Sequence, residues 1–156
     1  MGNTHATTII FSKIGRYLLA IVLLTSGISK CFYLHSFSNE VSQYSELYVS
    51  SALVSFSSQI AIAVCCVEIL LGLLLLFARF TLLSIFTVSV LMLFFLYLTG
   101  VNYFFPTVLG RIESCGCFGE LIHFSARGSF IKTLVLCVIS FATFCLVVKE
   151  KQTLTV

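Results

Sequence analysis

The stretch "IAIAVCCVEILLGLLLLF", residues 60–77, contains a single charged side chain, Glu68. A run of this length is close to the roughly 20 apolar residues that cross the hydrocarbon core of a bilayer as a helix. Inside lipid, only α-helices and closed β-barrels satisfy all of their backbone hydrogen bonds. Because the run is continuous and does not alternate between apolar and polar residues, it predicts a transmembrane helix and not a barrel strand.

The composition extends this prediction to the whole chain. Of its 156 residues, 59% are hydrophobic and 10% are charged, whereas a soluble domain has about 25% charged residues. The net charge of +3 is too small and too scattered for a nucleic-acid-binding patch, and no P-loop, Rossmann or haem-attachment motif occurs. We therefore predict an all-α polytopic membrane protein, a four-transmembrane-helix bundle in one domain (1–156), with helices at about 14–34, 53–77, 80–100 and 130–148.

The sequence around the start of the first helix and between the second and third helices leads to two further predictions. Lys13 and Arg16 precede an apolar run in the manner of a cleaved signal peptide, but no A-x-A cleavage site follows. We therefore expect the first helix to be retained. Only Ala78 and Arg79 separate the second helix from the third, which predicts a tight antiparallel hairpin of these two helices.

The first long connection has the pattern of an amphipathic helix. Its apolar residues recur with the helical period and its polar residues occupy the other side, which predicts a short helix on the membrane surface. Such a helix could form a lid over the second long connection; a polar loop with scattered aromatic residues is the alternative. The apolar set is Phe37, Val41, Tyr44 and Tyr48, and the polar set is Asn39, Glu40, Gln43 and Glu46.

The basic residues suggest an orientation. An even number of spans places both termini on one side, and the basic residues slightly favour cytoplasmic termini. The two longer connections, 36–51 and 101–129, would then face outward. We expect a multi-pass protein of a bacterial inner membrane, with the Cys115–Cys117 loop in the oxidising periplasm.

A pair of cysteines lies in the second connection, within "ESCGCFGE", residues 113–120. A disulfide between Cys115 and Cys117 would close a very small ring, which should be strained and oxidising and would add little stability. The pair therefore suits thiol–disulfide exchange, with His123 as a candidate acid/base. Three alternatives stay open: a structural bridge to another cysteine, a soft-metal site completed by His123 or His35, and two idle thiols.

These residues carry a family resemblance. "SCGCFGE", "RYLLAIVLLTSGISKCFYL" and "VEILLGLLLLFAR" resemble the MauE/DoxX family of redox-associated membrane proteins. In "SARGSFIK", Arg127 alone corresponds to an Arg-Asn pair that is common in the family. The resemblance implies a membrane thiol–disulfide or electron-transfer component, with a periplasmic thioredoxin-like or cysteine-rich protein as partner. The methylamine-utilisation branch is linked to disulfide maturation of a cysteine-rich dehydrogenase subunit. Other relatives are linked to quinone-coupled oxidation, which makes a quinone the candidate electron carrier.

Glu68 lies deep in the second predicted span. An acid at mid-membrane costs about 2.5–3.5 kcal/mol on insertion scales, a cost that the surrounding leucines offset. It shares a helix face with Cys65 and Gly72, which should look into the bundle. Lys30 is the expected partner, and a proton relay is one hypothesis for the pair. The alternative is a protonated Glu68 bound to hydroxyl groups of the first helix, at Thr25, Ser26 or Ser29.

The other cysteines are expected to differ among themselves. Cys31 follows Lys30, and a neighbouring ammonium favours a thiolate, so Cys31 is a candidate third participant in exchange. The remaining cysteines should pack as small apolar residues: Cys65, Cys66, Cys137 and Cys145.

The sequence thus predicts a membrane thiol–disulfide redox component. The alternative function is a non-catalytic membrane subunit or a small transporter with structural cysteines.

Overall fold

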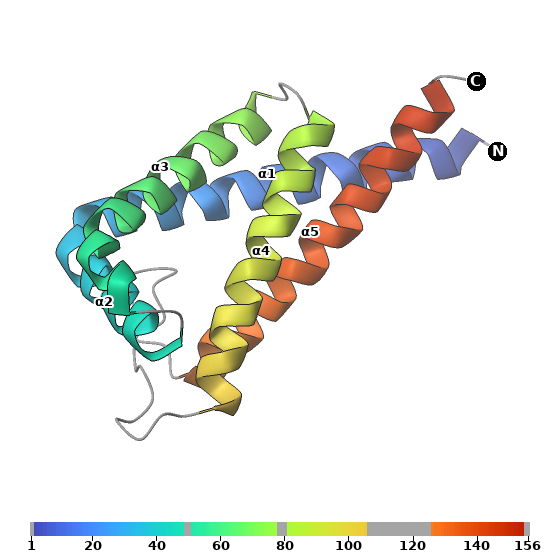
Figure 1. Cartoon of the computed structure of the whole chain (residues 1–156). Helices are drawn as coiled ribbons and strands as arrows, with labels where there is room; N and C mark the ends of the chain where they lie inside the picture. Colours follow the sequence, from blue (N-terminus) through green and yellow to red (C-terminus); the bar gives the residue numbers. More distant parts are fainter. Residues whose placement is uncertain (1, 49–50, 78–80, 106–125, 155–156) are drawn as a thin grey trace.

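The computed structural model describes residues 2–48, 51–77, 81–105 and 126–154. Cys115, Cys117 and His123 lie outside the described residues. The described chain is entirely helical, apart from short turns (Figure 1). Its elements are α1 (Gly2–Phe32), α2 (Leu34–Tyr48), the 3-10 helix η1 (Ser51–Phe56), α3 (Ser57–Leu76), α4 (Thr81–Phe104) and α5 (Ala126–Leu154).

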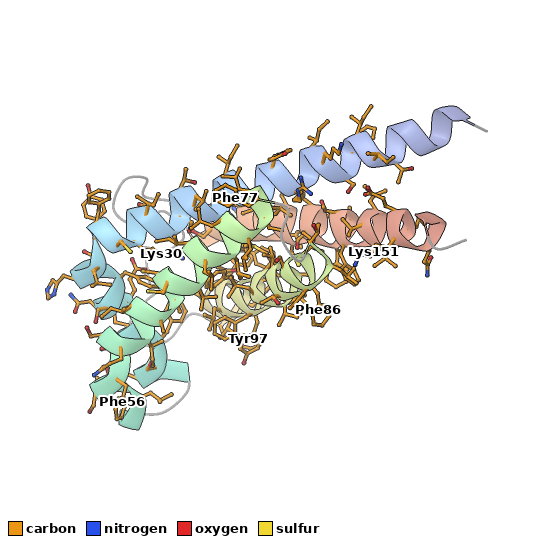
Figure 2. The ribbon with its side chains drawn as sticks, turned by 90° about the horizontal axis from the view of Figure 1, so that it is seen from above. Lys30, Phe56, Phe77, Phe86, Tyr97 and Lys151 are labelled. Carbon is orange, nitrogen blue, oxygen red and sulfur yellow. The ribbon has the colours of Figure 1, made fainter. Side chains whose placement is uncertain are left out.

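In the described part of the chain, four helical segments are long and apolar enough to cross a membrane. They are Thr8–Phe32, Leu53–Leu76, Thr81–Phe104 and Arg127–Gln152. Large apolar side chains cover their outer surface, and Figure 2 shows Phe77, Phe86 and Tyr97 pointing away from the helices. Such a surface requires lipid around it. The predicted fold class, an all-α membrane protein with four spans and one short helix, is confirmed.

The helices pack mainly as two pairs. The largest interfaces join α1 to α3 and α4 to α5, and a further interface joins α1 to α5. The interface between α3 and α4 is much smaller, and these two helices diverge from the point where the chain connects them (Figure 1). The expected tight hairpin is therefore not the main packing unit, because each of its helices packs more extensively against another partner.

Two glycines explain the close contact between α1 and α3. A Cβ atom at Gly72 would lie 2.8 Å from Cγ of Leu24 and 3.2 Å from the carbonyl oxygen of Ala20. A Cβ atom at Gly27 would lie 2.8 Å from Cγ1 of Ile69 and 3.3 Å from the carbonyl oxygen of Cys65. Small residues at such crossings let two backbones approach within van der Waals contact, which is a main source of helix association in lipid.

The α4–α5 pair is joined by polar and aromatic contacts. Near the middle, the Ser89 and Ser140 hydroxyl groups are 2.8 Å apart and both are buried. At the end where α4 stops and α5 starts, Tyr103 stacks on Phe130 with ring centroids 5.5 Å apart, and Phe104 meets both rings edge-on. The Arg127 Nε group donates a hydrogen bond of 3.3 Å to the Tyr103 hydroxyl group. We call Tyr103, Phe104 and Phe130 the aromatic stack.

Helix α2 covers the first half of α3. It packs against α3 and η1, and its buried Phe37 forms a cluster with Ala61 and Cys65. Phe37 belongs to the apolar face that the sequence predicts, whereas Glu40, predicted on the polar side, is buried as well. In Figure 1, α2 lies at the end of the molecule away from both termini, which is also the end where α4 stops.

Substituting Gly27 with Ala should destabilise the fold. The added methyl group would meet the backbone of Cys65 and the Cβ atom of Glu68, both at 3.3 Å, and overpacking of this kind costs about 1–3 kcal/mol. Thermal unfolding of the detergent-solubilised protein should show a lower midpoint.

Gly100→Ala is the matched control. A Cβ atom there would meet only the Phe130 ring, at 3.6 Å or more. Equal unfolding midpoints for the two variants would show that α1 and α3 do not depend on close approach at Gly27.

Candidate functional site

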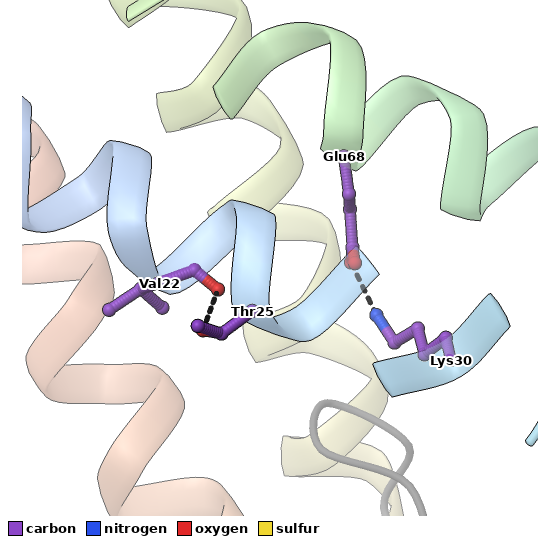
Figure 3. Close-up of polar contacts among 4 residues, drawn as sticks. All are labelled: Val22, Thr25, Lys30 and Glu68. Carbon is purple, nitrogen blue, oxygen red and sulfur yellow. Dashed lines mark hydrogen bonds and ion pairs between the residues drawn. The ribbon is translucent and has the colours of Figure 1, made fainter. Parts of the chain in front are cut away.

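A buried ion pair joins α1 to α3. The Lys30 ammonium, in the last turn of α1, donates a hydrogen bond to Oε1 of Glu68, in the middle of α3 (Figure 3). Each side chain is 1% exposed. The sequence suggested these two residues as partners, and the structure brings them together. Pairing lowers the cost of burying both charges, because each would be expensive to hold alone in lipid.

Aromatic rings complete the surroundings of the ammonium. The Lys30 Nζ atom lies 5.1 Å from the ring centroid of Phe37 on α2 and 4.8 Å from that of Phe95 on α4. Rings in these positions attract a cation through their negative faces. Residues of four helices, α1 to α4, therefore meet around the positive charge of Lys30.

Thr25, one of the alternative partners of Glu68, bonds elsewhere. Its hydroxyl group donates to two carbonyl oxygens of its own helix, that of Ile21 at 2.9 Å and that of Val22 at 3.0 Å. Figure 3 shows the contact with Val22. Since Oε1 of Glu68 accepts from Lys30, the ion pair takes the place of the proposed contact with Thr25.

Glu68 also lines a small cavity. Oε2 is buried and has no hydrogen-bond partner among the described residues. Glu68, Ser26 and Thr133 supply the polar part of the lining of a cavity of about 10 Å³. This volume is at the lower limit for one water molecule, and the three side chains could bind one. The carboxylate thus has one oxygen on the ammonium and one without a hydrogen-bond partner in the described part of the chain.

A much larger cavity has Lys30 in its wall. It has a volume of about 310 Å³, is partly open, and is otherwise lined by residues of α2, η1, α3 and α4. Four aromatic side chains line it, together with the polar side chains Glu40, Ser45 and Thr99; the aromatic residues are Phe37, Tyr44, Phe94 and Phe95. Its size lies at the lower end of the range for small-molecule sites. Lys30 therefore faces the large cavity while Glu68 faces the small one.

Two thiols lie next to the ion pair. Cys31 is exposed and Cys65 is buried, and the contact of α1 with α3 at Gly27 brings the two residues to neighbouring turns of the two helices. Of the other described cysteines, Cys66 and Cys145 are exposed and Cys137 is buried. His35 is exposed on α2, and no group of three metal-ligating side chains occurs in the described part of the chain. The cysteine pair at 115 and 117 lies outside that part.

Comparison with protein families gives one match. The model of the family described as methylamine utilisation protein MauE matches residues 8–147. The chain belongs to the MauE family. The resemblance noted in the sequence is thereby confirmed. No curated protein and no solved structure matches the chain.

The structure of this MauE-family protein reveals one contact that sequence reasoning missed. Cys65 was expected only to pack, yet the contact of α3 with Gly27 sets it beside the turn of α1 that contains Cys31. A signal was present: Gly27, Lys30 and Cys31 share one face of α1, at spacings of three and four residues. Cys65 and Glu68 share one face of α3 in the same way, so a Lys30–Glu68 pair brings the two cysteines together. The large cavity had no such signal, because its α4 wall consists of ordinary span residues.

The ion pair of the MauE-family chain can be measured by a double-mutant cycle. Either Lys30→Met or Glu68→Met alone leaves one buried charge unpaired, which should cost about 3–5 kcal/mol of stability. The double substitution removes both charges and should recover most of this loss. Unfolding free energies of the detergent-solubilised variants provide the measurement.

Lys13→Met, at an exposed position of α1, is the control for loss of a lysine. Additive losses in the double variant would mean that the two side chains are not coupled.

Proposed function

We propose that the chain is an inner-membrane thiol–disulfide redox component, in which Cys115 and Cys117 exchange disulfides with a periplasmic protein partner. The observation that carries this proposal is the position of the C-x-C pair, which lies inside the stretch matched by the MauE family model. The termini would be cytoplasmic and the partner would be a thioredoxin-like or cysteine-rich protein. Disulfide maturation during methylamine utilisation is the corresponding biological process.

The exchange proceeds in two balanced steps. A partner thiolate attacks one sulfur of the Cys115–Cys117 disulfide, which forms a mixed disulfide and releases the other sulfur as a thiolate. A second partner thiolate then attacks the partner sulfur of the mixed disulfide and releases the second cysteine. The partner gains a disulfide and loses two electrons and two protons, which the C-x-C pair takes up. A strained small ring favours this oxidising direction.

The buried site supports a second half-reaction. To act again, the reduced C-x-C pair must pass two electrons and two protons to a membrane carrier, for which a quinone is the candidate class. The large cavity at Lys30 has aromatic walls and a volume of about 310 Å³, which suits a flat apolar ring. Glu68 lines the small cavity and has one oxygen without a described hydrogen-bond partner, so it would accept or release a proton. Lys30 would hold a carrier oxygen at the cavity wall.

Cys117→Ser should trap the partner. The remaining Cys115 thiolate can attack a partner disulfide by the reverse reaction, and no neighbouring thiol then releases the mixed disulfide. Non-reducing electrophoresis of membranes, followed by mass spectrometry, should show a covalent complex that reductant dissolves. Cys145→Ser, which removes an exposed cysteine of α5, is the control and should trap nothing. A Cys117→Ser chain without any mixed disulfide would favour the alternative, a non-catalytic membrane subunit or a small transporter.

The proposed orientation has its own test. In spheroplasts, a membrane-impermeant maleimide should label Cys115 and Cys117 only weakly before mild reduction and strongly after it. This result follows if the pair is outside the membrane and oxidised at rest. A chain without Cys115 and Cys117 gives the background from the other cysteines. Labelling that needs permeabilised cells would place the loop on the cytoplasmic side and contradict the orientation.

A further inference from the structure

We propose that Cys31 and Cys65 form a second redox pair, which exchanges its electrons with a disulfide and, when oxidised, links α1 to α3 covalently. This inference rests on the proposed function, in which the exchanging disulfide is that of Cys115 and Cys117. The chemistry of the pair itself requires only a disulfide as oxidant.

The backbone geometry brings the two thiols together. A Cβ atom at Gly27 would lie 3.3 Å from the carbonyl oxygen of Cys65, so the helices are in contact at that level. Cys31 follows Gly27 by four residues, about one helical turn, and therefore lies on the same face of α1. The contacts at Gly27 and Gly72 show that α1 and α3 run antiparallel, which sets Cys31 opposite the turn of α3 that ends at Cys65. The ion pair of Lys30 and Glu68 holds the same two faces in register.

The two thiols differ in access. Cys31 lies one residue before the end of its candidate span, Thr8–Phe32, and is exposed. Cys65 is 1% exposed and packs with Phe37 of α2 and Ala61. A disulfide that arrives from the aqueous side can therefore reach Cys31 before Cys65. This order assigns Cys31 as the attacking thiol and Cys65 as the resolving thiol.

The transfer balances as a dithiol–disulfide exchange. The Cys31 thiolate attacks one sulfur of the incoming disulfide, which forms a mixed disulfide and expels the other sulfur as a thiolate. The Cys65 thiolate then attacks the Cys31 sulfur and expels the second thiolate. The protons lost by Cys31 and Cys65 are taken up by the two expelled sulfurs, and two electrons move with them. The products are the Cys31–Cys65 disulfide and a reduced dithiol.

The location of Cys31 and Cys65 indicates the route along which electrons would move. Cys31 is adjacent in sequence to Lys30, whose ammonium lies in the wall of the large cavity. Cys65 precedes Glu68 by one helical turn on the same face of α3. The pair thus lies between the end of the α1 span and the buried charges, where electrons could pass between the aqueous side and a carrier in the cavity.

The test uses the full-length chain with Cys115→Ser and Cys117→Ser, so that it does not depend on the C-x-C pair. The detergent-solubilised protein is reduced, then treated with oxidised glutathione, alkylated and digested. Mass spectrometry should recover a peptide pair joined through Cys31 and Cys65. In buffers of graded glutathione ratio, this product should form and disappear reversibly, which a merely structural packing of two thiols would not do.

Cys66 provides the matched control. It follows Cys65 but is exposed on another face of α3, so a further Cys65→Ser substitution leaves a thiol close in sequence and misplaced in space. Because proximity governs the rate, the Cys31–Cys66 product should form at least about tenfold more slowly than the Cys31–Cys65 product. Equal rates, or no Cys31–Cys65 disulfide in a chain that unfolds at the normal temperature, would overturn the inference. A failure here together with a trapped complex in Cys117→Ser would leave the proposed function standing and remove only the second pair.

Discussion

Lys30 and Glu68 can both lie inside the bundle because each neutralises the other. A lone ammonium or carboxylate at this depth would be expelled or would lose its charge. Their contact therefore requires the last turn of α1 to lie against the middle of α3, and the two helices to keep one rotational setting. The glycines make this approach sterically feasible, and Phe37 and Phe95 bring α2 and α4 to the same point. The proximity of Cys31 to Cys65 follows from the same arrangement.

The individual elements of this structure could be predicted from the sequence because their signals are local. Continuous apolar runs define the four spans, and the spacing of Phe37, Val41 and Tyr44 defines α2. Glu68 was identifiable as a buried acid, since a charge within an apolar run must face the protein interior. Lys30 was the nearest suitable partner on the preceding helix.

The pairing of the helices was harder to predict, because it depends on side-chain fit between segments far apart in sequence. A short connection suggested that α3 would pack on α4, whereas the glycines at 27 and 72 favour α1 and the Ser89–Ser140 contact joins α4 to α5. The large cavity results from this difference, because α2 lies beside the diverging α3 and α4. A periodicity argument treats each helix alone, so it cannot place residues such as Thr99 in a shared cavity wall.

The aromatic stack sets a limit on where the C-x-C pair can act. Tyr103 and Phe104 are the last residues of α4, and Phe130 lies in the first turns of α5. The contacts among these three rings therefore hold the end of α4 next to the start of α5. Cys117 precedes Ala126 by nine residues (126 − 117 = 9), and an extended chain advances at most about 3.6 Å per residue. The sulfurs are therefore tethered within about 30–35 Å of the start of α5. For the proposed exchange, a partner protein would therefore have to bring its own thiols inside this radius, at the end of the molecule away from both termini.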